Sequence, residues 1–170
     1  MAFFTKTGDD GTTAILRKNR VNKYDIQIET IGTLDEANAA LGLCRASVCS
    51  NEVKEIILTV QKQLYQVMGE AAAEKDVAEK FRSINQESVK WIETTIDSIS
   101  QKTKIPSEFI VPGDTRGGAF LGLARTIIRR AERRMVELFD HKILENEELL
   151  KFLNRLSSLL FVLELYENFI

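Results

Sequence analysis

The chain has 170 residues, of which 44% are hydrophobic and 28% are charged, a composition typical of one globular domain with its own core. Its net charge is −2, so bulk charge gives no reason to expect binding to nucleic acid. No run of about 18 apolar residues is present, and residues 1–6 lack the apolar stretch of a signal peptide. We therefore expect a cytoplasmic protein that does not enter a membrane.

Residue types that commonly carry nucleophilic or metal chemistry are scarce. The two cysteines, Cys44 and Cys49, have a spacing that fits neither a redox pair nor a zinc site. The single histidine, His141, would have to support any histidine metal site or catalytic triad alone. We therefore predict no protein nucleophile and no resident metal site.

Hydrophobic periodicity predicts an all-α protein, with residues 1–24 forming an irregular lead segment and residues 25–170 forming the bundle. We find no segment with convincing strand alternation, and residues 75–82 are expected to be a loop or a weak helical turn. A second helix is expected to be capped by Asn51. Of the five expected helices, the first begins at Asp25 and the second at Asn51. The other three cover about 85–100, 115–140 and 145–168.

Small residues recur every seven positions in the first expected helix. Gly32, Ala39 and Ala46 would form a stripe along one side of that helix. A glycine in a helix interior is destabilising by about 1 kcal/mol relative to alanine, so we expect close packing of another helix against the stripe to offset it.

Two distant segments have the composition of polyphosphate-binding elements. The first, residues 5–13, is a run of hydroxyl side chains, glycines and acids that suits backbone and hydroxyl contacts. The second, residues 125–134, places five arginines on one expected helix. Guanidinium groups bind phosphate through two parallel hydrogen bonds, so the two segments together could clamp a triphosphate.

Helical geometry divides four of the five arginines between two surfaces. At about 100° per residue, Arg125, Arg129 and Glu132 form a polar patch beside the core face, whereas Arg130 and Arg134 face solvent or another subunit. An ordinary solvated basic face with intrahelical Glu–Arg pairs remains the alternative.

Two further polar residues lie among apolar helix positions. Asp35 would need a cation such as Arg125 if it were buried, and a solvent-facing Asp35 is the alternative. Asn154 lies at the edge of an apolar face, where a buried amide would need polar partners or a ligand.

Four blocks of this sequence resemble the PduO-type ATP:cob(I)alamin adenosyltransferases, in the order and approximate spacing of that family. They span nearly the whole chain. The blocks are Thr5-Lys6-Thr7-Gly8-Asp9-Asp10-Gly11-Thr12-Thr13; Arg20-Val21-Asn22-Lys23 with Gly32-Thr33-Leu34-Asp35-Glu36; Phe109-Ile110-Val111-Pro112-Gly113 with Ala124-Arg125 through Arg134; and Asn154-Arg155-Leu156-Ser157.

The resemblance implies a five-helix bundle of the ferritin-like, up-and-down kind, assembled as a homotrimer with active sites between subunits. It implies transfer of the 5′-deoxyadenosyl group of ATP to the cobalt of a reduced corrinoid, which gives adenosylcobalamin and tripolyphosphate, with Mg²⁺ as cofactor. A corrinoid reductase and an adenosylcobalamin-dependent enzyme are further partners in this interpretation.

The resemblance also assigns roles to individual residues. Asp35 and Arg125 resemble a pair that bridges subunits, and Phe109 resembles the aromatic residue that closes the lower face of the corrin ring. Arg129 is expected to act on the triphosphate. The ATP-binding residues implied are Thr5, Lys6, Thr7, Gly8, Thr13, Lys23, Arg129, Glu132, Arg133 and Asn154.

Four departures from the family pattern lie near these blocks. Ser158 stands where an aspartate is usual, and Gly122 where a histidine is frequent. Residues 14–18 lack the glycines common after the N-terminal motif, and residues 114–118 differ from the usual small polar run. Two other functions are considered. A non-catalytic helical-bundle regulator would need neither Phe109 nor an intact arginine patch. A P-loop NTPase is disfavoured because residues 5–13 lack the Gly-Lys-Ser/Thr ending and no βαβ pattern surrounds them.

Overall fold

The computed structural model describes residues 4–16, 20–47, 50–74 and 77–169. Five α-helices and one short 3₁₀ helix, η1 (Ala78–Phe81), lie within these residues. The predicted all-α bundle is therefore confirmed, and η1 falls where a weak helical turn was expected. The helices are α1 (Ile26–Ala46), α2 (Asn51–Ala71), α3 (Gln86–Ser100), α4 (Arg116–Asp140) and α5 (Glu148–Phe169).

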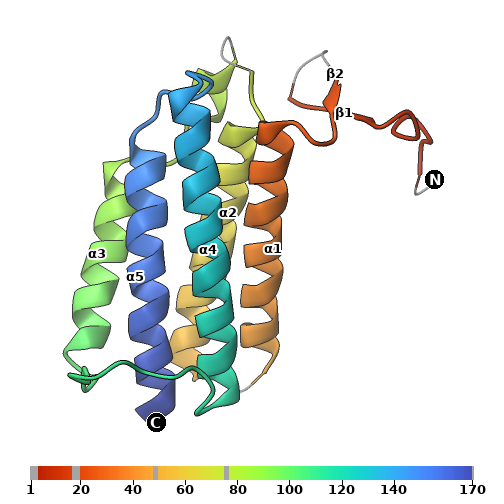
Figure 1. The fold of residues 1–170 in the computed structure, drawn as a ribbon. Helices are drawn as coiled ribbons and strands as arrows, with labels where there is room; N and C mark the ends of the chain where they lie inside the picture. Colours follow the sequence, from red (N-terminus) through yellow and green to blue (C-terminus); the bar gives the residue numbers. More distant parts are fainter. Residues whose placement is uncertain (1–3, 17–19, 48–49, 75–76, 170) are drawn as a thin grey trace.

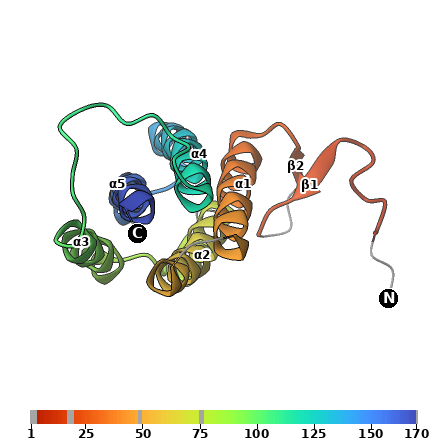
Figure 2. The same ribbon diagram turned by 90° about the horizontal axis from the view of Figure 1, so that it is seen from below.

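The helices alternate in direction along the chain and lie side by side as an up-and-down bundle (Figure 1). Helix α4 packs against both α1 and α5, α2 covers α1, and α3 covers α5 (Figure 2). A continuous hydrophobic core fills the space between them, with Leu34, Ile57, Ile128 and Phe152 fully buried. This packing makes α4 the central helix and sets its arginine-bearing face beside α5.

Side-chain caps fix where the helices begin. Asp25 accepts a hydrogen bond from the Gln27 amide at 2.9 Å, and Thr115 accepts one from the Gly118 amide at 3.0 Å. The predicted cap of α2 was wrong by one residue, because Ser50 Oγ accepts from the Val53 amide at 3.2 Å and Asn51 is the first helical residue. A hydroxyl at this position satisfies an amide that has no partner inside the helix.

The lead segment contains a β-hairpin, which the prediction of no strand missed. Strands β1 (Thr12–Ala14) and β2 (Arg20–Asn22) pair antiparallel, with Thr13 opposite Val21. Each strand has three residues, too few for an alternating pattern to stand out in the sequence. After β1, the Leu16 amide donates to Ala72 O at 2.9 Å and ties the segment to the end of α2.

The small-residue stripe of α1 does not pack inside the bundle. Gly32, Ala39 and Ala46 are all exposed, and a Cβ built on Gly32 would meet no atom within 4 Å. Close packing against another helix of the same chain is therefore not what offsets these residues. Leu43 on the same helix is 52% exposed, so an apolar, closely approachable face of α1 is left open in the single chain.

Candidate functional site

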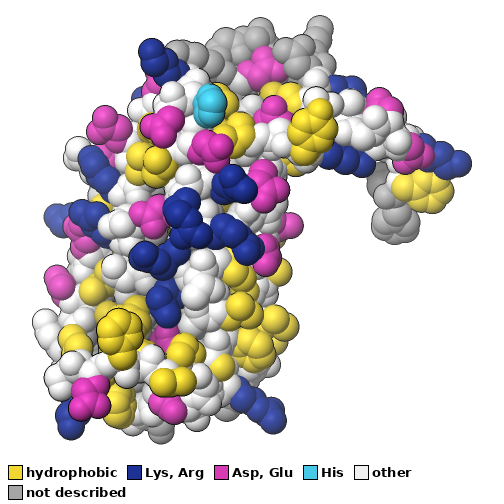
Figure 3. Space-filling view, viewed as in Figure 1, with side chains coloured by type: hydrophobic (Ala, Val, Ile, Leu, Met, Phe, Trp, Pro, Cys, Tyr) yellow, Lys and Arg dark blue, Asp and Glu magenta, His cyan; other side chains and the backbone are white. Residues whose placement is uncertain are grey.

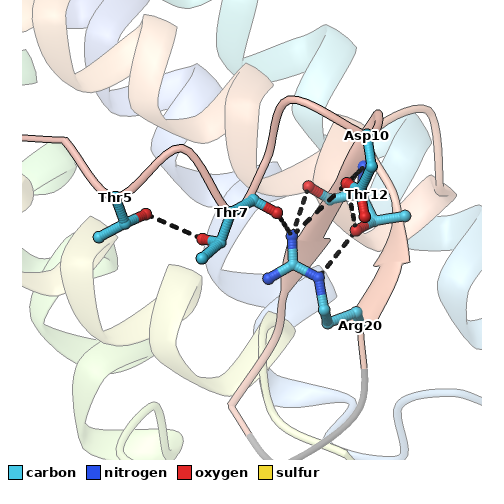
Figure 4. Close-up of polar contacts among 5 residues, drawn as sticks. All are labelled: Thr5, Thr7, Asp10, Thr12 and Arg20. Carbon is cyan, nitrogen blue, oxygen red and sulfur yellow. Dashed lines mark hydrogen bonds and ion pairs between the residues drawn. The ribbon is translucent and has the colours of Figure 1, made fainter.

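The N-terminal loop is organised by a residue that the sequence interpretation did not single out as functional. Arg20 donates from Nε to Thr12 Oγ1 at 2.8 Å, from Nη2 to Thr12 O at 3.0 Å, and also from Nη2 to Thr7 O (Figure 4). The hydroxyls of Thr5 and Thr7 hydrogen-bond to each other at 2.8 Å. One guanidinium thus fixes the path of the loop between Thr7 and Thr12.

Asp10 closes the same loop from the other side. It accepts from the Thr12 amide at 2.9 Å and from the Thr12 hydroxyl at 2.8 Å. These hydrogen bonds lower the pKa of Asp10, since they stabilise the carboxylate form. The carboxylate therefore remains ionised at neutral pH and holds the turn that leads into β1.

The remaining predicted phosphate ligands of the lead segment gather on this loop. A Cβ on Gly8 would lie 3.3 Å from both Lys23 Nζ and Thr12 O, so the Lys23 ammonium lies against the Gly8 backbone. Lys6 has a φ of 60° and Gly11 a φ of 82°, both in the left-handed region that turns the chain sharply. The structure thus brings Lys23 to the loop that carries Thr5, Lys6, Thr7 and Gly8, with Thr13 on the adjoining strand.

A basic surface covers α4 at the middle of the face shown in Figure 3. Arg130 forms an ion pair with Glu36 of α1, and Arg134 pairs with Glu137 at 3.1 Å. Arg133 Nη1 donates to Arg129 O at 3.0 Å. The side chain of Arg129 has no ion-pair partner within the described part of the chain, so its charge is available to a ligand.

Asn154 and Glu132 connect α5 to α4 beside this surface. Asn154 Nδ2 donates to Glu132 Oε1 at 2.8 Å, and Arg155 Nη1 donates to Asn154 Oδ1 at 3.1 Å. Asn154 is exposed, not buried, but it has the polar network that the sequence indicated. The network fixes the orientation of the amide and the carboxylate next to Arg129.

Two neighbouring cavities meet at Arg125 and Phe161. One, of about 300 Å³, is lined by Arg125, Arg129, Ser157, Ser158, Phe161 and Val162. The other, of about 370 Å³, is lined by Ser107, Glu108, Phe109, Ile110, Arg125 and Phe161. The first combines two guanidiniums with two hydroxyls, and the second has two aromatic side chains, so the pair suits an anionic group beside a flat apolar one.

Arg125 is held from behind by an acid that the sequence interpretation missed. Its Nε lies 3.6 Å from Oε2 of Glu164, whose side chain is fully buried, and its guanidinium carbon lies 5.7 Å from the centre of the Phe161 ring. Burial raises the pKa of Glu164, and the nearby Arg125 charge only partly opposes this effect. The sequence did contain a signal for this residue, because Glu164 is the single acid in the otherwise apolar run 159–165.

The two segments predicted to bind phosphate do not meet within one chain. Both views place the hairpin and its loop beyond α1, on the side away from α4 and α5 (Figures 1 and 2). Asp35 is exposed on α1, and the carboxylate next to Arg125 is Glu164 instead. A clamp made of the loop and the arginine helix therefore requires two chains.

Comparison with known proteins identifies the family of this fold and site. The family model described as cobalamin adenosyltransferase matches residues 3–167. The chain belongs to the cobalamin adenosyltransferase family. It is similar to the corrinoid adenosyltransferase PduO of Citrobacter freundii, with 38% identity over 99% of this chain and 50% of that protein. A shorter corrinoid adenosyltransferase of the same organism is 34% identical over 93% of this chain and 90% of its own length.

Solved structures agree with this assignment. A variant of the PduO-type ATP:corrinoid adenosyltransferase from Lactobacillus reuteri, complexed with cobalamin and ATP, superposes with a TM-score of 0.91. It is 30% identical, and the match covers 99% of this chain and 91% of that one. The chain spans about half the length of the PduO relatives it matches.

The predicted site residues of this adenosyltransferase-family chain fall into two spatial groups. Phe109 and Arg125 line one cavity, and Arg125 and Arg129 line the other. Arg133 donates to Arg129 O, and Asn154 donates to Glu132 one turn along α4 from Arg129. The residues of the N-terminal loop form the second group. Sequence reasoning missed Arg20, whose role depends on an unforeseen hairpin, and the pair of Phe161 and Glu164.

No group of three His, Cys, Asp or Glu residues that could hold a metal ion occurs among the residues described. Nor does any helix in the described ranges have the length and apolar character needed to cross a bilayer.

Proposed function

We propose that this protein transfers the 5′-deoxyadenosyl group of ATP to the cobalt of a reduced corrinoid, as an ATP:cob(I)alamin adenosyltransferase. In this reaction the Co(I) electron pair forms a bond to C5′, the C5′–O bond breaks, and tripolyphosphate leaves with the bonding electrons. The cobalt is itself the nucleophile, so the protein needs no serine, cysteine or histidine to attack. Its task is to orient two substrates and to neutralise a polyanionic leaving group.

The observation that supports this proposal most directly is the pair of cavities that share Arg125 and Phe161. Arg129 and Arg125 offer guanidiniums where phosphate would lie, and Phe109, fully exposed at the rim of the other cavity, offers an aromatic face to a corrin ring. A triphosphate and a planar macrocycle are the two substrates that such a surface would recognise. The relatives and the structural neighbour named above act on or bind those compounds.

The nucleotide would enter as its Mg²⁺ complex. Mg²⁺ usually keeps several waters and binds through one or two protein groups plus substrate phosphates, so it needs no cluster of carboxylates. The loop of Thr5 to Gly8, together with Thr13 and Lys23, would hold the phosphates from one side. Arg129, Glu132, Arg133 and Asn154 would complete the site from the other.

A homotrimer with sites between subunits explains how the two sides meet. The loop and the arginine helix are separate in one chain, so the loop of one subunit would close over α4 of the next. The open face of α1, with its exposed small residues and Leu43, supports such an interface, as do Leu123 and Val136 on α4, which are 48% and 42% exposed. Light scattering of the purified protein would measure the assembly directly.

Within that trimer, Asp35 of one subunit would pair with Arg125 of its neighbour beside the nucleotide. Asp35→Asn removes the charge and keeps the shape, so we expect turnover or corrinoid binding to weaken by about tenfold, the value of a charged pair at an interface. Glu36→Gln is the matched control, because Glu36 already pairs with Arg130 in its own chain. Unchanged kinetics in Asp35→Asn would contradict the bridging role.

The decisive experiment is anaerobic incubation of the protein with ATP, Mg²⁺ and chemically reduced cobalamin, followed by the corrinoid absorbance. Conversion to the adenosyl form with release of tripolyphosphate, absent without protein, is expected. If ATP binds and no conversion occurs, the protein is a nucleotide-binding regulator and the proposal is wrong. The same proposal places the enzyme in the cytoplasm, supplied by a corrinoid reductase and serving an adenosylcobalamin-dependent enzyme.

A further inference from the structure

Glu164 is an anomaly in an otherwise apolar stretch of α5. It is fully buried, and neither carboxylate oxygen has a hydrogen-bond partner within the described residues. Its nearest charge is Arg125, at 3.6 Å, which is beyond hydrogen-bond distance. A buried carboxylate with so little compensation destabilises a fold, and an apolar residue of similar size would stabilise it.

Gly122 supplies the space that this carboxylate occupies. It lies on α4, one turn before Arg125, and a Cβ there would come within 2.9 Å of Glu164 Oε1 and 3.2 Å of Oε2. Even the smallest side chain at this position would push the carboxylate away. The chain thus keeps both a helix-weakening glycine and an unfavourable buried acid so that the acid can lie behind one arginine.

The position of Arg125 explains what the acid does. Arg125 is one-quarter exposed, lies over the Phe161 ring, and forms a wall of both cavities. An arginine side chain has several rotatable bonds, and only Glu164 holds its inner end by charge among the described residues. We propose that Glu164 is a positioning residue, which fixes the Arg125 guanidinium between the phosphate cavity and the aromatic cavity, and that Gly122 is required for this placement.

This inference rests on the proposed function. It predicts a result that differs from the one expected if Glu164 only stabilised the fold. If Glu164 served only the fold, Glu164→Gln would lower stability. As a positioning residue, it should give the opposite result: Glu164→Gln keeps or raises thermal stability while kcat falls by roughly 10- to 100-fold, the range expected when a catalytic group is misplaced by about 1 Å. The KM for ATP should change less than threefold, because Arg129 still contacts the phosphates.

The pH profile adds a second readout. The charged groups that act on Glu164 are Arg125 of α4, which lowers its pKa, and Asp114 before α4, which together with burial raises it. Protonation of Glu164 at low pH releases Arg125, so the wild-type enzyme should show an acid limb in kcat that lies above the usual range of a glutamate. Glu164→Gln should lack that limb, and Glu164→Asp, which retains the charge, should keep it.

Gly122→Ala tests the geometry without removing the acid. It should lower kcat as Glu164→Gln does. The double variant, Gly122→Ala with Glu164→Gln, should have the same kcat as Glu164→Gln alone. Once the carboxylate is replaced by an amide that does not hold Arg125, moving that amide has no further effect. Gly69→Ala is the matched control for helix propensity, since its Cβ would meet no atom within 4 Å. Glu70→Gln, at another buried acid that lines neither cavity, is the matched control for charge removal, and both control variants should keep wild-type kcat.

The outcomes separate this inference from the proposed function. Wild-type protein that transfers no adenosyl group refutes both. Active wild type with an unchanged kcat and acid limb in Glu164→Gln refutes the positioning role alone. A folded, active Glu164→Gln with reduced stability also refutes it, since the acid would then serve the fold. Additive losses in the double variant would refute the role of Gly122.

Discussion

The N-terminal loop and the α4–α5 face both present groups suited to phosphate, but they are built in opposite ways. The loop is held by hydrogen bonds among exposed side chains, centred on Arg20, Thr12 and Asp10. The α4–α5 face lies on a continuous apolar core that reaches Ala124, Ile128 and Leu160. The loop is thus a local structure on the surface, whereas the arginine face is part of the bundle itself.

Acidic residues in the two regions show the same contrast. Hydrogen bonds lower the pKa of exposed Asp10, whereas burial raises the pKa of Glu164 and of Glu70. The loop therefore gains from its carboxylate, while the bundle retains carboxylates that oppose folding. The two regions therefore place their acids by different means, the loop through hydrogen bonds and the bundle through burial.

The largest effect should come from removing Arg129, whose side chain has no ion-pair partner among the residues that the structure describes. We expect Arg129→Ala to lower adenosyl transfer by about 10²-fold or more, because one preorganised charge directed at a developing anion is lost. The bundle should remain folded, since Arg129 is exposed and its side chain holds no ion pair among the described residues. Turnover under saturating corrinoid, with circular dichroism as the check on folding, measures this.

Arg82→Ala is the matched control for Arg129→Ala. Arg82 is an exposed arginine next to η1 that pairs with Glu79 at 3.3 Å and lines neither cavity, so the same net charge is removed outside the proposed site. Near-normal turnover in Arg129→Ala would remove the basis for assigning this face to the triphosphate.

A mixing experiment tests whether the loop and the arginine face of different chains act together. Lys23→Ala should inactivate the loop side and Arg129→Ala the α4 side. If each site combines a loop from one chain with α4 from the next, equal mixing with subunit exchange restores about a quarter of the sites, since half of the loops and half of the α4 helices are intact. Activity recovered from two inactive variants would be measured against each variant alone. Sites formed within single chains predict no recovery.

The helices were predictable because their apolar residues follow a helical period over many turns. The core positions of α2, for example, recur from Val53 through Leu64 to Met68. The hairpin was not, because three-residue strands give no measurable alternation and its stability comes from Arg20 contacting residues eight and thirteen positions away. Contacts of this kind depend on tertiary structure and leave no local pattern.

Site residues divide in the same way. Arg125, Arg129 and Glu132 could be placed on one polar patch by helical geometry alone. The partner of Arg125 within the chain could not, because the sequence interpretation considered only Asp35, and Glu164 comes beside Arg125 through the packing of α5 against α4. Gly122 was noticed only as a departure, and its meaning depends on the carboxylate across the helix interface.

A smaller effect should follow from loosening the loop. We expect Arg20→Ala to raise the KM for ATP several-fold with little change in kcat, because the loop would have to be ordered by the ligand, which weakens binding without altering the α4 side. Amide hydrogen exchange at residues 9–12 should become faster in the variant and recover with ATP. Arg45→Ala, which removes a contact with Gln61 in the bundle, is the control and should leave those amides unchanged. Equal exchange in Arg20→Ala and wild type would mean that the loop does not depend on this guanidinium.

The smallest effect concerns the acids of the bundle, and its sign is fixed by the direction of their pKa shifts. Burial raises the pKa of Glu70, so between the usual glutamate pKa and the folded-state pKa the folded protein binds a proton that the unfolded chain has released. The contribution of Glu70 to stability therefore falls as pH rises through that range. Glu70→Gln keeps an acceptor for Asn146, whose Nδ2 lies 3.2 Å from Glu70 Oε2. The variant should therefore gain stability relative to wild type at neutral pH, by about 1 kcal/mol, and lose that advantage in acid.

Glu52 provides the opposite case on the same helix. Hydrogen bonds from Lys102 and Tyr166 lower its pKa, so its contribution is present above the unfolded pKa and disappears as pH falls through the folded one. Glu52→Gln should therefore lose stability at neutral pH and converge with wild type in acid. Chemical denaturation of both variants at several pH values measures the two trends. If the free energy of unfolding depends on pH in the same way for Glu70→Gln and wild type, burial does not raise the pKa of Glu70. The contrast between buried acids in the bundle and a hydrogen-bonded acid in the loop would then rest on Glu164 alone.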